Sequence, residues 1–195
     1  PYFDGAADVL DVGCGRGEFL DLLAGRGITA RGVDLNHEMV EECRARGLHA
    51  VEGDAVAFLE SISDGSLGGV FAAQVVEHLE PTHLLRFLEL AFHKLEPGAH
   101  IVLETLNPAC WVAFFESYIR DITHRWPLHP ETLKYLVIAS GFASAAIEWR
   151  SPVPQHDRLQ PVRVPPGADP LSSDLAEAFN ANVEKLNARM FTHLD

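Results

Sequence analysis

Between Asp8 and Leu20 the sequence reads DVLDVGCGRGEFL. Its first five residues form a mainly apolar run, which predicts a β-strand. Leu22 and Leu23 follow Phe19 at helical spacing, so an α-helix is expected after the strand. A strand that leads directly into a helix is the unit from which parallel sheets covered by helices are built.

Three glycines, Gly13, Gly15 and Gly17, separate this strand from this helix. They permit a tight turn and the close approach of a ligand to bare backbone, although an ordinary strand-to-helix turn is the simpler alternative. The third glycine comes one residue earlier than in the dinucleotide pattern G-x-G-x-x-G. Asp11 would also repel a pyrophosphate at this turn. Asp11, the three glycines and Cys14 therefore favour a cationic nucleoside such as S-adenosylmethionine.

The next part of the chain continues the alternation of strands and helices. Strands are expected at residues 30–34, 49–52, 70–73 and 100–106, and helices at residues 36–46 and 81–95. The pattern predicts an α/β fold, a Rossmann-like three-layer sandwich with a mostly parallel sheet.

The pattern changes after residue 106. We expect an acceptor-side insertion at about residues 107–130, with an aromatic-rich stretch at 111–126, followed by a helix at 130–140 and a sixth strand at 143–150. The main domain would then span residues 1–150, and the prolines between 151 and 170 indicate a linker. Apolar residues at three-to-four spacing in 171–195 predict a C-terminal helix packed back on the domain.

Polar residues follow the predicted strands at the edge where a cofactor would bind. Asp34, followed by Leu35, lies about 20 residues beyond the glycines, where an acid can accept hydrogen bonds from ribose. Asp54, followed by Ala55, could accept from an adenine amino group, and Gln74 would lie near the other end of the ligand. A helix N-cap for Asp34 and a solvated turn for Asp54 are the alternatives.

Composition excludes several classes of protein. The chain has 195 residues, 47% of them hydrophobic, and a formal net charge of −13, which argues against a surface that follows nucleic acid or anionic lipid. No apolar run approaches the ~20 residues of a membrane span. Three cysteines without C-x-x-C spacing fit reduced thiols, so a cytoplasmic protein is expected.

These motifs resemble those of the class I S-adenosylmethionine-dependent methyltransferases. The likeness rests on residues 11–17, on Asp34, on residues 53–55 (GDA) and on residues 95–99 (LEPGA). A narrower likeness, carried by residues 15–20, 104–108 and 121–130, is to methyltransferase domains of bacterial polysaccharide and O-antigen biosynthesis. The resemblance implies methyl transfer to a saccharide or glycan-terminal group, by a chain that belongs to a longer polypeptide with a glycosyltransferase. It also implies a last, antiparallel strand that this sequence lacks.

A hydroxyl acceptor needs a base, and His124 is the first candidate because its neighbours are aromatic and polar. His78, after the fourth strand, is the second, with core packing as its alternative role. Asp121, His124 and His129 match no spacing typical of a metal site, so no metal is expected. The alternatives for the whole chain are a methyltransferase with a non-sugar small-molecule acceptor, a non-catalytic cofactor-binding module and a nicotinamide-dependent oxidoreductase.

Overall fold

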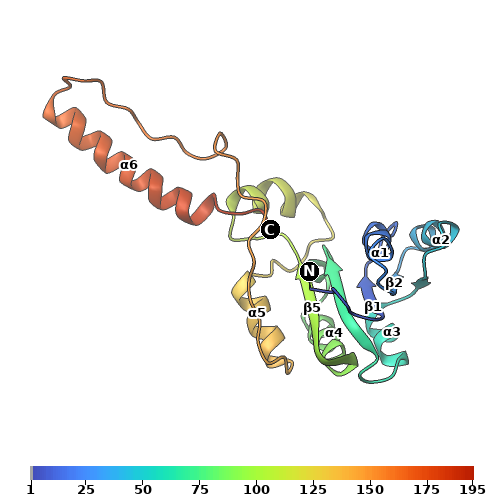
Figure 1. The fold of residues 1–195 in the computed structure, drawn as a ribbon. Coiled ribbons are helices and arrows are strands. Elements are labelled where there is room, and N and C mark those ends of the chain that lie inside the picture. The colour runs from blue at the N-terminus through green and yellow to red at the C-terminus, as the bar shows by residue number, and fades with distance from the viewer. Residues whose placement is uncertain (1) are drawn as a thin grey trace.

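The structure is a computed structural model that describes residues 2–195. Its five strands form one sheet in the order β3-β2-β1-β4-β5 (Figure 1). All strand pairs are parallel, which confirms the predicted α/β, Rossmann-like fold. The strands are β1 (Val9–Val12), β2 (Ala30–Asp34), β3 (Ala50–Glu52), β4 (Leu67–Ala73) and β5 (Leu95–Glu104).

Six α-helices and three short helical turns connect and extend these strands. The helices are α1 (Glu18–Ala24), α2 (His37–Ala45), α3 (Ala55–Ser61), α4 (Pro81–Lys94), α5 (Pro130–Ala139) and α6 (Pro170–Met190). The short turns are η1 (Val76–His78), η2 (Ala113–Ser117) and η3 (Tyr118–Arg120). α3 has only seven residues and was not predicted from the sequence.

Helices cover both faces of the sheet because successive residues of each strand point to opposite faces. Val9 packs with Leu23 of α1, whereas its neighbour Leu10 belongs to the core formed with Leu59 of α3 and Phe87 of α4. Strands of a parallel sheet that is buried on both faces are apolar at nearly every position, and β1 is completely buried.

The strand order creates a crevice at the carboxyl ends of the strands. The chain builds β2 and β3 on one side of β1 and then crosses to place β4 on the other side. The register aligns Val12 with both Val33 and Ala72, so β1, β2 and β4 end at one edge. Open α/β sheets bind ligands at such a switch point, here between β1 and β4.

The predicted sixth strand is wrong. Residues 143–150 form no ladder with β5 or with any other described strand. Three alanines occupy this segment where a strand would favour β-branched residues, and Trp149 is 46% exposed.

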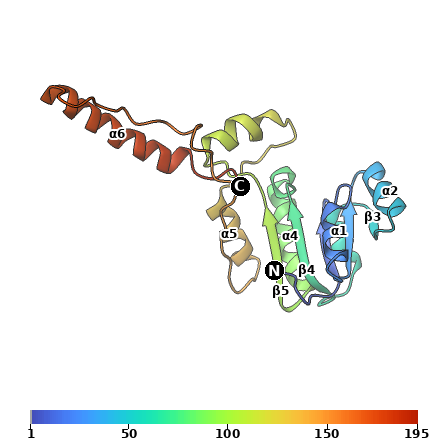
Figure 2. The ribbon, with the colours of Figure 1, turned by 45° about the horizontal axis from the view of Figure 1, so that its top comes forward.

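The C-terminal helix begins at Pro170 but does not pack on the sheet. Instead, α6 extends away from the domain together with residues 159–164, as both views show (Figure 2). The Asn187 side chain bonds to the backbone of Leu159 and that of Asn180 to the backbone of Val162. The expected linker thus forms part of a projecting arm, residues 159–190. Neither α6 nor any other helix of the described chain is long and apolar enough to cross a membrane.

Beyond the arm, the chain returns to the domain and is tied down there. The backbone N–H of Asn107 donates to the carbonyl of Leu194 at 2.8 Å, and its side-chain amide donates to the carbonyl of His193 at 3.1 Å. Asn107 is only 2% exposed. The segment that follows β5 is therefore packed against residues 86 positions further along the chain.

Candidate functional site

The glycine turn leaves one stretch of backbone open. Gly13 has φ +67°, and a Cβ there would lie 2.5 Å from Cγ2 of Val75, so this glycine is required by packing. Gly15 has φ +51°, and a Cβ there would meet no atom within 4 Å. The backbone at Gly15 therefore faces free space, as contact with a ligand requires. Gly17, with φ +83°, is the N-cap residue of α1.

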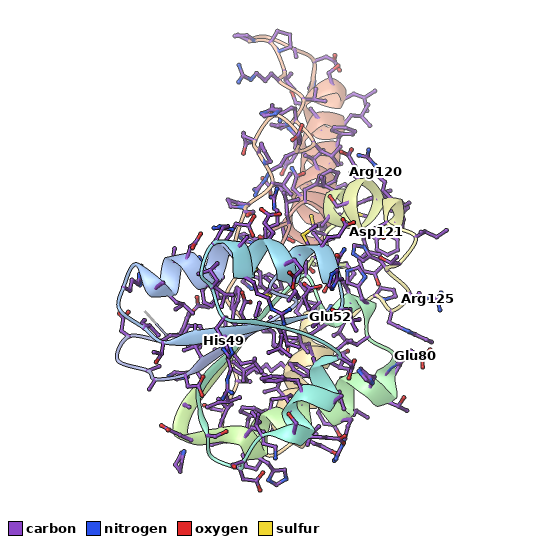
Figure 3. The ribbon with its side chains drawn as sticks, turned by 90° about the vertical axis from the view of Figure 1, so that its right-hand side faces the viewer. His49, Glu52, Glu80, Arg120, Asp121 and Arg125 are labelled. Atoms are coloured by element: carbon purple, nitrogen blue, oxygen red, sulfur yellow. The ribbon has the colours of Figure 1, made fainter. Side chains whose placement is uncertain are left out.

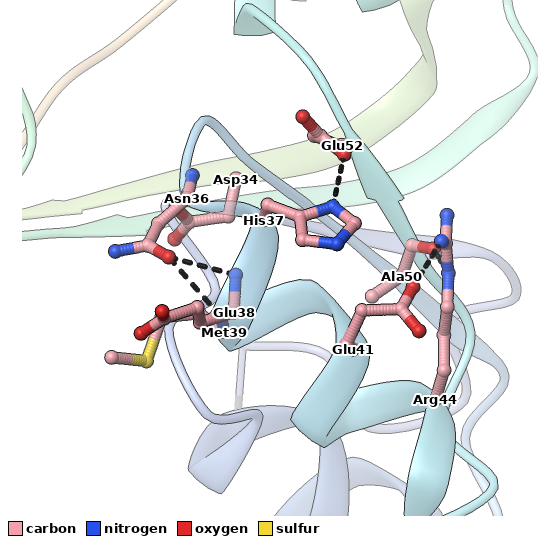
Figure 4. A network of polar contacts seen from close by, with 9 residues as sticks. All are labelled: Asp34, Asn36, His37, Glu38, Met39, Glu41, Arg44, Ala50 and Glu52. Carbon is pink, nitrogen blue, oxygen red and sulfur yellow. Dashed lines mark hydrogen bonds and ion pairs between the residues drawn. The ribbon is translucent and has the colours of Figure 1, made fainter.

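Asp34 fixes this turn from the end of β2. Its Oδ2 accepts a hydrogen bond from the backbone N–H of Gly15 at 2.9 Å, and its Oδ1 accepts from the N–H of Asn36 at 2.8 Å. Asn36, not Asp34, caps α2, since its side chain accepts from Glu38 and Met39 (Figure 4). A carboxylate offers about four acceptor sites, so Asp34 retains capacity for a ligand. Next to it, the Leu35 side chain is 75% exposed.

Figure 4 also shows an acid at the end of β3 beside this cap. Glu52 Oε2 lies 2.7 Å from Nδ1 of His37, the first residue of α2. Hydrogen bonding to Glu52, followed by its negative charge, raises the pKa of His37. This pair joins the start of α2 to the end of β3 and was not predicted from the sequence.

Asp11 is a buried acid under the glycine turn. It is 3% exposed, and burial, followed by the negative charges of Asp34 and Glu18, raises its pKa to about 7. A cation that approached Asp11 would favour its ionised form and would bind more tightly in return.

The buried Asp11 makes stability depend on pH. Its folded pKa of about 7 lies above the usual 3.8, so the folded protein holds a proton that the unfolded chain releases. This contribution is complete below pH 3.8 and is lost as the pH rises through about 7. We expect Asp11→Asn to remove this loss, which is roughly 3 kcal/mol between pH 5 and pH 8.

The measurement is the free energy of unfolding in urea at pH 5 and pH 8. Glu42→Gln, on the exposed face of α2, is the control and should follow the wild-type change. Equal changes between the two pH values in Asp11→Asn and in the wild type would contradict the assignment.

Cys14 lies beneath the turn and is 5% exposed. A Cβ at Gly32 of β2 would lie 2.4 Å from its Sγ, so the thiol fills the space next to that strand. Burial raises the pKa of the Cys14 thiol. The side chain therefore has a packing role. The Cys14 backbone holds the turn together, because its N–H donates to the carbonyl of Val33 at 3.3 Å and its carbonyl accepts from the N–H of Gly17 at 2.9 Å.

Asp54 acts as the N-cap of α3. Its Oδ1 accepts hydrogen bonds from the N–H groups of Val56 and Ala57, and its Oδ2 lies 3.0 Å from Nε2 of His83. Ala55 is the first residue of α3. An adenine amino group would have to share Asp54 with His83, a partner from α4 that the sequence analysis missed.

Gln74 follows β4 in a left-handed conformation, with φ +55°. Such a conformation is uncommon outside glycine and clusters at functional sites. Its N–H donates to the carbonyl of Glu104 at 2.8 Å, which ties the ends of β4 and β5 together, and its side chain is exposed.

Directly after Gln74, the turn η1 brings Glu77 and His78 next to His124. One ligand atom from each of these side chains lies within 4.8 Å of the other two. Glu77 is fully buried, yet neither of its carboxylate oxygens has a hydrogen-bond partner among residues 2–195. An unpaired buried carboxylate is costly, so this cluster is a site candidate by its chemistry. The grouping is also compact enough for one metal ion, whereas Asp121 and His129 do not belong to it.

His124 is held in one tautomer. Its Nδ1 lies 2.9 Å from the carbonyl oxygen of Tyr118, which can only accept, so Nδ1 carries the proton. In the neutral ring, Nε2 is then the acceptor; no hydrogen bond from a described residue occupies it, and Oδ2 of Asp121 lies 3.8 Å away. The ring also lies 4.6 Å from that of His78 and 4.7 Å from that of Tyr118, measured between centroids.

Tyr118, Asp121 and Thr123 complete the surroundings of the two histidines. The Tyr118 hydroxyl is buried without a partner; burial, and then the charge of Glu77, raise its pKa. The Thr123 hydroxyl lies 3.0 Å from Nδ1 of His78 and donates to Asp121 at 2.6 Å. Hydrogen bonds from Thr123 lower the pKa of Asp121.

The segment after β5 thus lies over the carboxyl edge of the sheet. Figure 3 shows Asp121 and Arg125 on the same side of the molecule as Glu80, which follows η1. An open cavity of about 490 Å³ lies elsewhere, at the base of the arm, with Asn107, Trp149 and Phe191 in its lining. None of its lining residues belongs to the glycine turn or to η1.

Comparisons with known proteins identify the family of this chain. Residues 1–165 match the family described as "Methyltransferase domain". The crystal structure of a SAM dependent methyltransferase from Archaeoglobus fulgidus superposes with a TM-score of 0.88 and 36% sequence identity. That match covers 100% of this chain and 85% of the other.

Curated relatives match over a shorter range. The ubiquinone biosynthesis O-methyltransferase of Xanthomonas oryzae pv. oryzae is 35% identical over 107 residues, which are 52% of this chain and 44% of the relative. The human mitochondrial protein of that name is 28% identical over 153 residues, 69% of this chain and 41% of the relative. The chain spans less than half the length of these relatives. The family match over most of the chain nevertheless shows that it belongs to the class I S-adenosylmethionine-dependent methyltransferases.

Proposed function

We propose that this chain transfers a methyl group from S-adenosylmethionine to a hydroxyl oxygen. The observation that carries the proposal is the approach of His124, from the segment after β5, to Glu77 and His78 at the end of β4. It brings an acid and two potential bases to the crevice where the family binds its cofactor. When bound, S-adenosylmethionine supplies an electrophilic methyl group on a sulfonium.

The residues at the strand ends fit this cofactor. Asp34 has acceptor sites left for the two ribose hydroxyls, and the open backbone at Gly15 leaves room beside them. The pKa of Asp11 is raised by burial and by two neighbouring acids, and no positive charge in the described part of the chain offsets them. A cationic ligand would supply that charge. The adenine would lie by Leu35, Asp54 and Ala55 and the methionyl end by Gln74, while Gly13, Gly17 and the backbone of Cys14 shape the turn.

His124 is proposed as the general base. Its Nε2 is free to accept the proton of the attacking hydroxyl, because Nδ1 is bonded to Tyr118. The buried Glu77 carboxylate would stabilise the imidazolium that forms. Thr123 and Asp121 orient His78, which is the second candidate for the base.

For the acceptor we propose a saccharide hydroxyl, presented by a small molecule or at the end of a glycan. Trp126 is 44% exposed and offers a flat face for a sugar ring, and exposed Arg125 and Asp121 can bind its hydroxyls. A glycosyltransferase on the same polypeptide would supply such a saccharide acceptor. The second candidate is an aromatic hydroxyl, which the name of the curated relatives favours.

The test is transfer of a labelled methyl group to a panel of glycans, simple saccharides and dihydroxybenzoates. Product with either class supports O-methylation and selects the acceptor. Binding of cofactor without transfer to any hydroxyl, but with transfer to amines or thiols, would contradict the proposal. If a chelator lowered the rate and a divalent ion restored it, the mechanism would depend on a metal bound by Glu77, His78 and His124. The proposal of His124 as general base would then be wrong.

Two glycine variants separate ligand contact from folding. Gly15→Ala should cost roughly 1–2 kcal/mol through backbone strain alone, yet lower the affinity for S-adenosylhomocysteine about tenfold or more. Gly13→Ala should destabilise the protein further, by about 1–3 kcal/mol, because its methyl group meets Val75. Thermal unfolding and calorimetric titration measure the two effects.

Gly27 provides the control for Gly15→Ala. It has φ +72° and equally free space at its Cβ, but it lies between α1 and β2, away from the proposed site. Gly27→Ala should show the same strain with unchanged affinity. Full affinity in Gly15→Ala would mean that its backbone does not contact the cofactor.

A further inference from the structure

The arm exposes an apolar stripe on a face of α6 next to the one that holds its partner segment. Ala176 and Val183 are buried, but Leu171, Leu175, Phe179 and Leu186 are 67, 62, 51 and 41% exposed. At about 100° per residue, these four lie within a sector of about 80°. Contiguous apolar surface of this kind marks an interaction site.

The arm cannot cover this stripe by folding back on the domain. At its base, the N–H of Val153 donates to the carbonyl of Thr192 at 3.0 Å, and the N–H of Leu194 donates to that of Ser151 at 3.0 Å. Both ends of the arm are thus held together, and Asn180 and Asn187 hold the extended segment to the helix along its length. Figures 1 and 2 both show the arm clear of the sheet and its helices.

The charges of α6 point to a second copy of this chain as the partner. α6 carries Asp174 and Glu177 in its N-terminal half and Glu184, Lys185 and Arg189 in its C-terminal half; Glu177 and Glu184 lie on the face away from the stripe. Asp174 precedes Phe179 by five residues, and Lys185 follows it by six. The two are eleven residues apart, close to three full helical turns, so they lie on the same flank of the stripe.

We propose that two copies pair through antiparallel α6 helices, with a two-fold axis next to Phe179. A two-fold axis perpendicular to the helices brings the same flank of each helix together. Asp174 of each copy then faces Lys185 of the other, twice per dimer, while the four apolar side chains of each helix cover those of its partner. A parallel pairing would instead place like charges opposite each other.

The first test measures the mass of the full chain in solution. It also uses a cysteine placed next to the two-fold axis to test whether the two helices meet there. We expect a dimer by light scattering, and Phe179→Cys should form a disulfide-linked dimer under mild oxidation. The natural cysteines, Cys14, Cys43 and Cys110, are buried and should not interfere. Glu177→Cys, exposed on another face of α6, is the matched control and should not cross-link.

The second test is charge reversal. Asp174→Lys should weaken dimerisation by roughly tenfold or more, because it places two lysines opposite each other at both contacts. The double variant Asp174→Lys/Lys185→Asp should restore it. A monomer at all concentrations, equal cross-linking of Phe179→Cys and Glu177→Cys, or no rescue by the double variant would each overturn the proposal. Unchanged binding of S-adenosylhomocysteine in every variant shows that the domain has remained folded.

Discussion

His124→Ala should lower the turnover number by about 10²–10⁴-fold and leave the affinity for S-adenosylmethionine nearly unchanged. The expected loss follows from the geometry, since Nε2 of His124 is the free acceptor of a ring fixed by Tyr118. Glu77→Gln should lower the turnover number as well, because the imidazolium would lose its buried counter-charge. Steady-state rates with the acceptor found in the panel, together with calorimetric titration of the cofactor, check both effects.

His78→Ala is tested in parallel, and His156→Ala, in an exposed loop, is the control. If His124→Ala keeps more than about a third of the rate while His78→Ala does not, the base is His78. If both variants keep the wild-type rate, methyl transfer needs no histidine as base. An acceptor that is already ionised, such as a phosphate or a carboxylate, would behave in this way.

Asp34→Ala should weaken binding of S-adenosylhomocysteine about tenfold or more. Two hydrogen bonds from ribose to a charged acceptor are worth roughly 1.5–3 kcal/mol each. The variant also frees the N–H of Gly15, so the turn loses its support from β2. Asp34→Asn is the second variant, because its amide oxygen can still accept from Gly15.

Calorimetric titration gives the dissociation constants, and thermal unfolding shows whether the fold has changed. Glu52→Ala is the matched control: this acid ends the next strand and bonds to His37, so its loss should change the affinity only slightly. An unchanged dissociation constant in Asp34→Ala would refute the ribose assignment.

The part of the fold that depends on local signals could be predicted from the sequence. The glycine turn, the Asn36 cap and Pro81 at the start of α4 each act within a few residues of where they occur. The sheet followed from the alternation of apolar runs and amphipathic stretches. By contrast, residues 143–150 have weak strand character, and whether such a segment joins a sheet is decided by its neighbours in space.

The arm and the histidine cluster could not be predicted for a related reason. An apolar stripe indicates that a helix has a partner, but not whether that partner is its own domain. His78 and Thr123 are 45 residues apart in the sequence, and only the fold brings them within 3.0 Å. The sequence shows that Glu77 precedes His78. Only the structure shows that its carboxylate is buried without a hydrogen-bond partner among the described residues.

The attachment of Asn107 to residues 193 and 194 also bears on how the protein is made. During synthesis, the sheet and α1 to α4 can begin to form once β5 has left the ribosome, because the strand pairs and most of their core lie earlier in the chain. The segment that carries Tyr118 and His124 starts at Asn107 and has to wait for its partner His193, 86 residues further along the chain. Closing so large a loop is slow compared with local folding. The cofactor half of the crevice therefore forms first, and the half that holds the proposed base is completed last.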